Sequence, residues 1–210
     1  SLISDHLRRA QTNTGQGIRL FNHVYTATDG NAGGWTNAYD VIDRTNRVLQ
    51  ALPQVEAETQ QVDSLLTRIE GEMIALRAHQ HFNLFRAYAD FELNGDDLAA
   101  PYLLEPQAPE SQPARDTKAE FFNKLQDDID NGLAILEPFG IFSTQRMNII
   151  ALEALQARVA LYRENFQMAA DFASRVINEV PLTSRNDYPN LWDDSMDGEI
   201  LLKLPRQTPN

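Results

Sequence analysis

The sequence predicts a mainly all-α protein with long loops and little strand. Apolar residues recur at the 3.6-residue spacing of a helix along three long stretches, residues 35–53, 56–90 and 117–138. A fourth stretch, residues 146–180, carries this spacing twice, on either side of a polar break at residues 163–165. Only residues 199–204 have the character of a strand, and a short one.

The first predicted helix begins at Trp35, directly after a loop rich in glycine, asparagine and aspartate at residues 28–34. It ends at Pro53, because proline cannot continue a helix. Asn46 is a polar residue on its apolar side. We expect Asn46 to hydrogen-bond a neighbouring group, since a buried amide without a partner is costly; a ligand-binding role is the alternative.

The longest predicted helix covers residues 56–90 and would be about 50 Å long at 1.5 Å per residue. Gly71 lies in its interior, where glycine costs up to ~1 kcal/mol relative to alanine. This glycine predicts either close contact with another helix or a bend. Residues 91–116 contain four prolines, and we expect them to form a long loop on the surface.

The next helix is predicted to begin at Asp116 or Thr117, with Glu120 placed to complete a capping box, and to end at Glu137-Pro138. Residues 146–180 then read as two helices joined by a short turn, and Pro181 ends the second. An alanine-rich helix pair of this kind is typical of one tetratricopeptide (TPR) repeat. An ordinary helical hairpin of any all-α protein is the alternative.

The composition limits the kinds of partner that the chain can have. Its 210 residues carry a net charge of −12, which repels nucleic-acid phosphates and anionic lipid surfaces, so we expect no nucleic-acid partner. No apolar stretch reaches the ~20 residues that a membrane-spanning helix needs. The length suits one domain, residues 1–210, and the unpartnered strand near the end predicts that the chain continues in the intact protein.

We find no catalytic, cofactor or metal motif in the sequence. His79 and His81 are two residues apart on a helix, so their side chains diverge and cannot share a zinc ion. The acidic run at residues 193–198 has Leu204 where a calcium loop needs its bidentate glutamate. Asp127, Asp128 and Asp130 read most simply as a solvated helix face.

Aromatic residues are the better candidates for ligand binding. An aromatic ring offers a flat apolar face that suits the C–H face of a sugar. Trp35 directly follows the glycine-rich loop and could be such a platform. The alternative is that Trp35 packs into the core at the start of its helix.

Taken together, the segments resemble the N-terminal half of the SusD/RagB family of outer-membrane nutrient-binding lipoproteins. The resemblance follows the chain in order and is densest in the helix pair near its end. The matching segments are Trp35–Pro53 (W-x3-Y-x2-I-x3-N-x2-L-x2-L-P), Gly71-Glu72, Leu76-Arg77-Ala78, Phe82–Tyr88, Thr117–Leu136, Ala151–Ile177, Tyr188, Leu191-Trp192 and Glu199-Ile200.

The resemblance implies TPR-like antiparallel helix pairs that form a right-handed superhelical scaffold. It also implies a surface-exposed lipoprotein of the outer membrane, attached through a lipid anchor outside this chain. Such a protein would bind oligosaccharide without catalysis and deliver it to a TonB-dependent, SusC-type transporter. The position of the family's sugar-stacking aromatic makes Trp35, Asn37 and Tyr39 the candidate ligand residues. A TPR-type adaptor that binds peptides and an α-helical glycoside hydrolase are the other hypotheses.

Overall fold

The structure is a computed structural model, and it describes residues 22, 24, 34–89, 94–193 and 195–203. The chain divides into two units, Ser1–Asn37 and Ala38–Asn210. The loop expected at residues 28–34 lies outside the described residues except for Gly34. The helices in chain order are α2 (Gly34–Ala51), the 3₁₀ helix η2 (Leu52–Gln54), α3 (Gln60–Tyr88), α4 (Lys118–Leu136), the 3₁₀ helix η3 (Glu137–Phe139), α5 (Ile149–Tyr162), α6 (Phe166–Glu179) and the short α7 (Pro189–Trp192).

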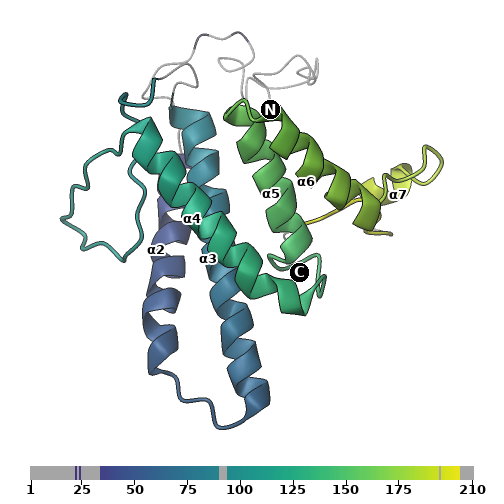
Figure 1. Ribbon diagram of the computed structural model, residues 1–210, viewed down its shortest axis with the longest axis horizontal. Helices are drawn as coiled ribbons and strands as arrows, with labels where there is room; N and C mark the ends of the chain where they lie inside the picture. Colours follow the sequence, from purple (N-terminus) through teal and green to yellow (C-terminus); the bar gives the residue numbers. More distant parts are fainter. Residues whose placement is uncertain (1–21, 23, 25–33, 90–93, 194, 204–210) are drawn as a thin grey trace, which may run out of the picture. The chain divides into compact units, whose positions relative to one another are not determined.

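No strand occurs in the described part of the chain, apart from one isolated bridge between Leu98 and Thr117. The predicted all-α class is therefore confirmed. Figure 1 shows α4 crossing α3, and α5 and α6 lying side by side as an antiparallel couple. The buried core is shared by α2 to α5 and includes Ile42, Phe82, Phe85, Phe121, Leu125, Ile129, Leu152 and Val159.

Helix α3 is the predicted long helix, although it begins later than expected. Residues 56–59 precede it, and Thr59 caps it by accepting a hydrogen bond from the backbone N–H of Val62. Its 29 residues are buried mainly from Gly71 onward, whereas Leu65, nearer the beginning of the helix, is 42% exposed. The apolar pattern predicted the helix correctly but overestimated how much of it is covered.

Gly71 marks a close contact between helices, which is one of the two outcomes expected for it. A Cβ atom at this position would lie 2.8 Å from Cγ2 of Ile135 and 2.9 Å from Cγ of Leu136. Gly132 plays the same part between α4 and α5, because a Cβ there would lie 2.8 Å from Cδ2 of Leu152. These two glycines let α4 pack closely against both neighbours.

The beginning of α4 follows the sequence prediction in detail. Thr117 accepts from the backbone N–H of Glu120 at 3.2 Å, and the Glu120 carboxylate accepts from the backbone N–H of Thr117 at 2.9 Å. This reciprocal pair is the expected capping box.

The couple α5–α6 confirms the predicted TPR-like pair. Asn148, which is 1% exposed, caps α5 by accepting from the backbone N–H of Ala151, and Asn165 caps α6 in the same way through Met168. Glu164 has a φ of 58°, a left-handed conformation that reverses the chain within three residues.

The prediction of a short strand at residues 199–204 is wrong for residues 199–203, the part that the structure describes, because these residues do not form a strand. One backbone hydrogen bond, from the N–H of Lys203 to the carbonyl of Thr144, joins it to the segment before α5. The Asn148 side chain also donates to the carbonyl of Leu201 at 3.3 Å. Leu201 and Leu202 pack against the core, so their apolar character reflects burial without a ladder of strand hydrogen bonds.

Candidate functional site

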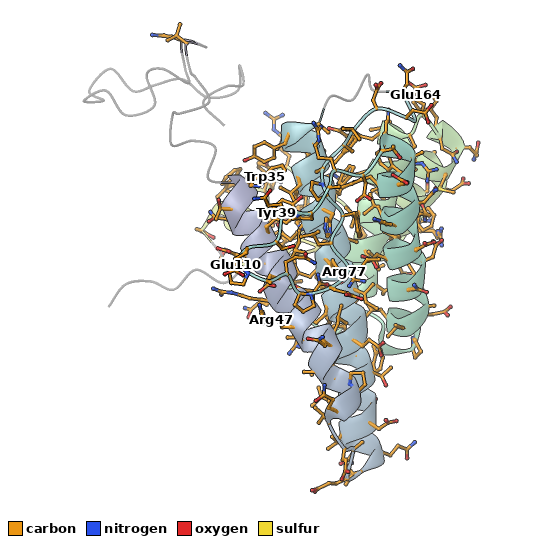
Figure 2. The ribbon with its side chains drawn as sticks, turned by 90° about the vertical axis from the view of Figure 1, so that its left-hand side faces the viewer. Trp35, Tyr39, Arg47, Arg77, Glu110 and Glu164 are labelled. Carbon is orange, nitrogen blue, oxygen red and sulfur yellow. The ribbon has the colours of Figure 1, made fainter. Side chains whose placement is uncertain are left out.

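The three residues predicted to bind ligand all lie in the first two turns of α2. Trp35 is 38% exposed and Asn37 is exposed, and both belong to the first unit. Tyr39 is half-buried and belongs to the second unit. Figure 2 labels Trp35 and Tyr39 at the beginning of this helix.

Tyr39 is held in place by its hydroxyl group. The hydroxyl donates to the carbonyl of Pro101 at 2.8 Å, and burial together with the charge of Asp116 raises its pKa. The ring meets His81 edge-on, with centroids 6.4 Å apart. The Tyr39 ring is therefore positioned by its packing, and its hydroxyl already has a partner.

Residues 98–107, which we call the strap, form the part of the predicted surface loop to which Tyr39 bonds. Contrary to the expectation of a loop lying on the surface, Ala99, Ala100, Pro101 and Tyr102 are buried. The chain can bury this irregular backbone because polar side chains of the helices satisfy it. Residues 90–93, at the start of the predicted loop, lie outside the described residues.

His81, on α3, provides a hydrogen-bond partner for the backbone of the strap. Its Nε2 accepts from the backbone N–H of Leu103 at 2.9 Å, so its Nδ1 carries the proton and donates to the carbonyl of Arg77 at 3.0 Å. Burial lowers the pKa of His81 to about 3, which keeps the ring neutral. The ring stacks on Tyr102, with centroids 3.7 Å and planes 13° apart.

Arg77 and Asp128 form a buried ion pair between α3 and α4. The guanidinium donates through Nε at 2.8 Å and through Nη2 at 2.6 Å to the two carboxylate oxygens. Burial acts to lower the pKa of Arg77, but the hydrogen bonds and charge of Asp128 outweigh it and leave that pKa raised. The Tyr102 hydroxyl also donates to Asp128, at 2.6 Å.

Asn46 extends this network to α2, as we expected of a structural residue. Its Oδ1 accepts from Nη1 of Arg77 at 2.8 Å, and its Nδ2 donates to the carbonyl of Leu103 at 3.0 Å. The prediction that Asn46 is buried and hydrogen-bonded is confirmed. The network therefore joins α2, α3, α4 and the strap, and Figure 2 shows Arg77 within this region.

The interpretation of the aspartates on α4 as a solvated face is wrong for Asp128, which is 4% exposed. The missed signal is helical register, because Asp128 falls on the same stripe as Phe121, Leu125 and Gly132, which are all buried. No group of three metal-ligating side chains occurs among the residues that the structure describes. None of the helices in that same part of the chain is long and apolar enough to cross a bilayer.

These features define an all-α, TPR-like scaffold in which a buried polar network holds α2 against α3, α4 and the strap. The family whose description reads "starch-binding associating with outer membrane" matches residues 2–161. The chain therefore belongs to this SusD-like family, and the resemblance found in the sequence is confirmed. No curated protein sequence matches this chain.

Solved structures share the fold over most of the chain. A SusD superfamily protein from Bacteroides thetaiotaomicron is 26% identical with a TM-score of 0.71, covering 88% of this chain and 41% of its own. A SusD-like carbohydrate binding protein from Bacteroides vulgatus is 21% identical with a TM-score of 0.63, covering 74% of this chain and 33% of its own. A laminarin binding SusD-like protein is 24% identical with a TM-score of 0.66, covering 85% of this chain and 38% of its own.

This chain spans less than half the length of each of these three proteins.

Proposed function

We propose that this protein binds oligosaccharide at the cell surface and delivers it to a TonB-dependent, SusC-type transporter of the outer membrane. The match of the carbohydrate-binding family over residues 2–161 is the observation that carries the proposal. In this proposal the protein is a surface lipoprotein anchored outside residues 1–210, it acts by binding alone, and these residues are the N-terminal half of the whole protein.

The proposed ligand residues are Trp35, Asn37 and Tyr39. The exposure of Trp35 supports a stacking role, because a sugar ring needs an accessible aromatic face. Asn37 is exposed and offers both a donor and an acceptor to sugar hydroxyls. Tyr39 would contribute the side of its ring, since its hydroxyl bonds to Pro101.

Isothermal titration with malto- and laminari-oligosaccharides tests the binding step. We expect Trp35→Ala to weaken binding about tenfold, equivalent to about 1.4 kcal/mol. Trp192→Ala is the matched control, because Trp192 is 77% exposed and lies on α7. Equal affinities of the two variants would show that Trp35 does not contribute to binding. The absence of a binding signal with both kinds of oligosaccharide would argue against glycan binding by this chain.

Co-purification of the full-length protein with its membrane partners tests the delivery step. We expect the lipid-anchored protein to recover a β-barrel transporter from detergent-solubilised outer membranes. Recovery of the anchored protein without any transporter would contradict this part of the proposal.

A TPR-type adaptor is the alternative function. Adaptors repeat helix pairs of about 34 residues, whereas α2, α3 and α4 have 18, 29 and 19 residues. Only α5 and α6, with 14 residues each, form an even pair in the described part of the chain. Binding of a peptide but not of any sugar would favour the adaptor, and release of reducing ends from the sugars would favour a hydrolase.

A further inference from the structure

A cleft of about 420 Å³ opens where α4, α5 and α6 meet. Its walls carry Gln126 and Asp130 from α4, and Gln156 from α5. Met168 and Phe172 come from α6. The volume falls in the range of small-molecule sites, which is about 300–1,000 Å³.

Two of the side-chain amides that line this cleft pair with each other. Gln126 donates from Nε2 to Oε1 of Gln156 at 2.9 Å, and Gln156 donates back to Oε1 of Gln126 at 3.3 Å. Gln156 is 1% exposed and lies among the apolar residues of α5, where leucine would pack without a polar cost. The buried amide therefore needs an explanation beyond helix packing.

Gln156 has one donor with a poor partner. Its Nε2 also contacts the sulfur of Met168 at 3.2 Å, and a thioether is a weak acceptor. Met168 is 37% exposed and its side chain is flexible, so it can move aside. A ligand hydroxyl in its place would give the buried amide a full hydrogen bond.

The rim of the cleft carries one negative and one positive group. Asp130 accepts from Nε2 of Gln126 at 2.9 Å, and Arg163 donates from Nη1 to Oε1 of Gln126 at 3.4 Å. The Arg163 guanidinium also lies 5.7 Å from the Phe122 ring centroid, which helps to hold it at the rim. Because the two charges balance, the cleft favours a polar ligand without net charge.

The apolar wall completes the site. Phe172 is half-buried, and the guanidinium of Arg175 lies 3.8 Å from its ring centroid, so the ring is fixed in place. A cleft lined by an aromatic ring, paired amides and a carboxylate matches a sugar, which has apolar C–H faces and polar edges.

We propose that this cleft is a second glycan subsite that binds one neutral sugar ring through Gln126, Gln156 and Asp130. The proposal rests on the proposed glycan-binding function but concerns a separate surface, built from α4, α5 and α6. The sugar hydroxyls donate to the Asp130 carboxylate and accept from the Gln156 amide, and the Met168 side chain moves away.

Nuclear magnetic resonance of the ¹⁵N-labelled chain tests both sites in one titration. The side-chain NH₂ signals of Gln126 and Gln156, assigned from the variants Gln126→Leu and Gln156→Leu, report on the cleft. The indole N–H signals of the chain's two tryptophans, Trp35 and Trp192, report on α2 and α7. We expect laminaritriose or maltotriose to shift both glutamine signals in a saturable manner.

Variants separate the two proposals. Asp130→Ala and Gln156→Leu should abolish the saturable shift at Gln126, whereas Gln167→Leu, an exposed change on α6 outside the cleft, should leave it unchanged. Saturation at the Trp35 indole without any change at the glutamines would overturn the cleft proposal and leave the proposed function standing. Absence of any shift would overturn both. Equal shifts with trialanine in place of sugar would overturn the assignment of a glycan.

Discussion

Replacing Asp128 by asparagine removes one charge from the centre of the protein and changes little else in shape. The Arg77 guanidinium, bonded at 2.6 and 2.8 Å, would then remain charged and buried beside an amide. Breaking a buried ion pair by removing one partner costs about 3–5 kcal/mol. We expect Asp128→Asn to lower the free energy of unfolding by this amount.

Urea unfolding of the whole chain, followed by circular dichroism, measures the effect. With a slope of about 2 kcal/mol per molar urea, the midpoint should fall by about 2 M. Asp127→Asn is the matched control, because Asp127 is the exposed neighbour of Asp128. This substitution should change the free energy of unfolding by less than about 0.5 kcal/mol. Equal effects of the two variants would refute the buried pair.

The double variant Arg77→Met with Asp128→Leu provides a second check. Removing both charges leaves no ion unpaired, and apolar replacement of a buried pair is often neutral or stabilising. We expect the double variant to be more stable than Asp128→Asn alone. A loss equal to the sum of both single variants would mean that packing, and not charge, determines the effect.

Three further predictions concern His81, two glycines and two helix caps. Because the pKa of His81 is lowered from 6.5 to about 3, the unfolded state binds the extra proton between these pH values. The free energy of unfolding should therefore fall as pH drops below 6.5, with this residue contributing up to about 1.4 kcal/mol per pH unit. Urea unfolding of His81→Gln at several pH values should show a free energy of unfolding that depends less steeply on pH. Gly71→Ala should destabilise by about 1–3 kcal/mol in thermal unfolding because its Cβ would clash with α4, whereas Gly95→Ala, with its nearest neighbour 3.8 Å away, should have little effect. Asn148→Ala should cost about 2 kcal/mol in urea unfolding, more than Asn165→Ala, because the two N–H donors of the buried Asn148 amide are also shared among three carbonyl groups. Equal losses for the two caps, or an unchanged pH slope in His81→Gln, would contradict these arguments.

Local signals in the sequence located most of the fold. The capping box at Thr117 and the proline at 181 fixed helix ends, since capping and ring geometry act over a few residues. Gly71 and Asn46 were understood correctly because each violates the local pattern of its helix and therefore needs a tertiary reason.

The missed features depend on contacts between distant segments. The strap begins with a mostly apolar run, residues 98–104, which favours burial, but the prolines of the segment predicted a surface loop. The partners of its backbone, His81 and Asn46, come from other helices. Asp128 is charged, and its charge alone suggested a solvated surface, whereas Gln156 was not singled out. Their helical register would have placed both on buried stripes. The roles of Trp35, Asn37 and Tyr39 in binding stay a prediction.

The clamped strap has a practical consequence for residues 108–114, which are exposed. Arg115 donates from Nε to the carbonyl of Ala99 at 2.5 Å and from Nη2 to the carbonyl of Leu98, and Asp116 accepts from the backbone N–H of Tyr102 at 2.6 Å. Substitutions at residues 108–114 should therefore leave the core unchanged. Since the chain has no cysteine, Glu110→Cys, at the position labelled in Figure 2, would introduce a unique thiol. Energy transfer between a fluorophore attached there and a labelled ligand would report ligand binding without a change in the scaffold.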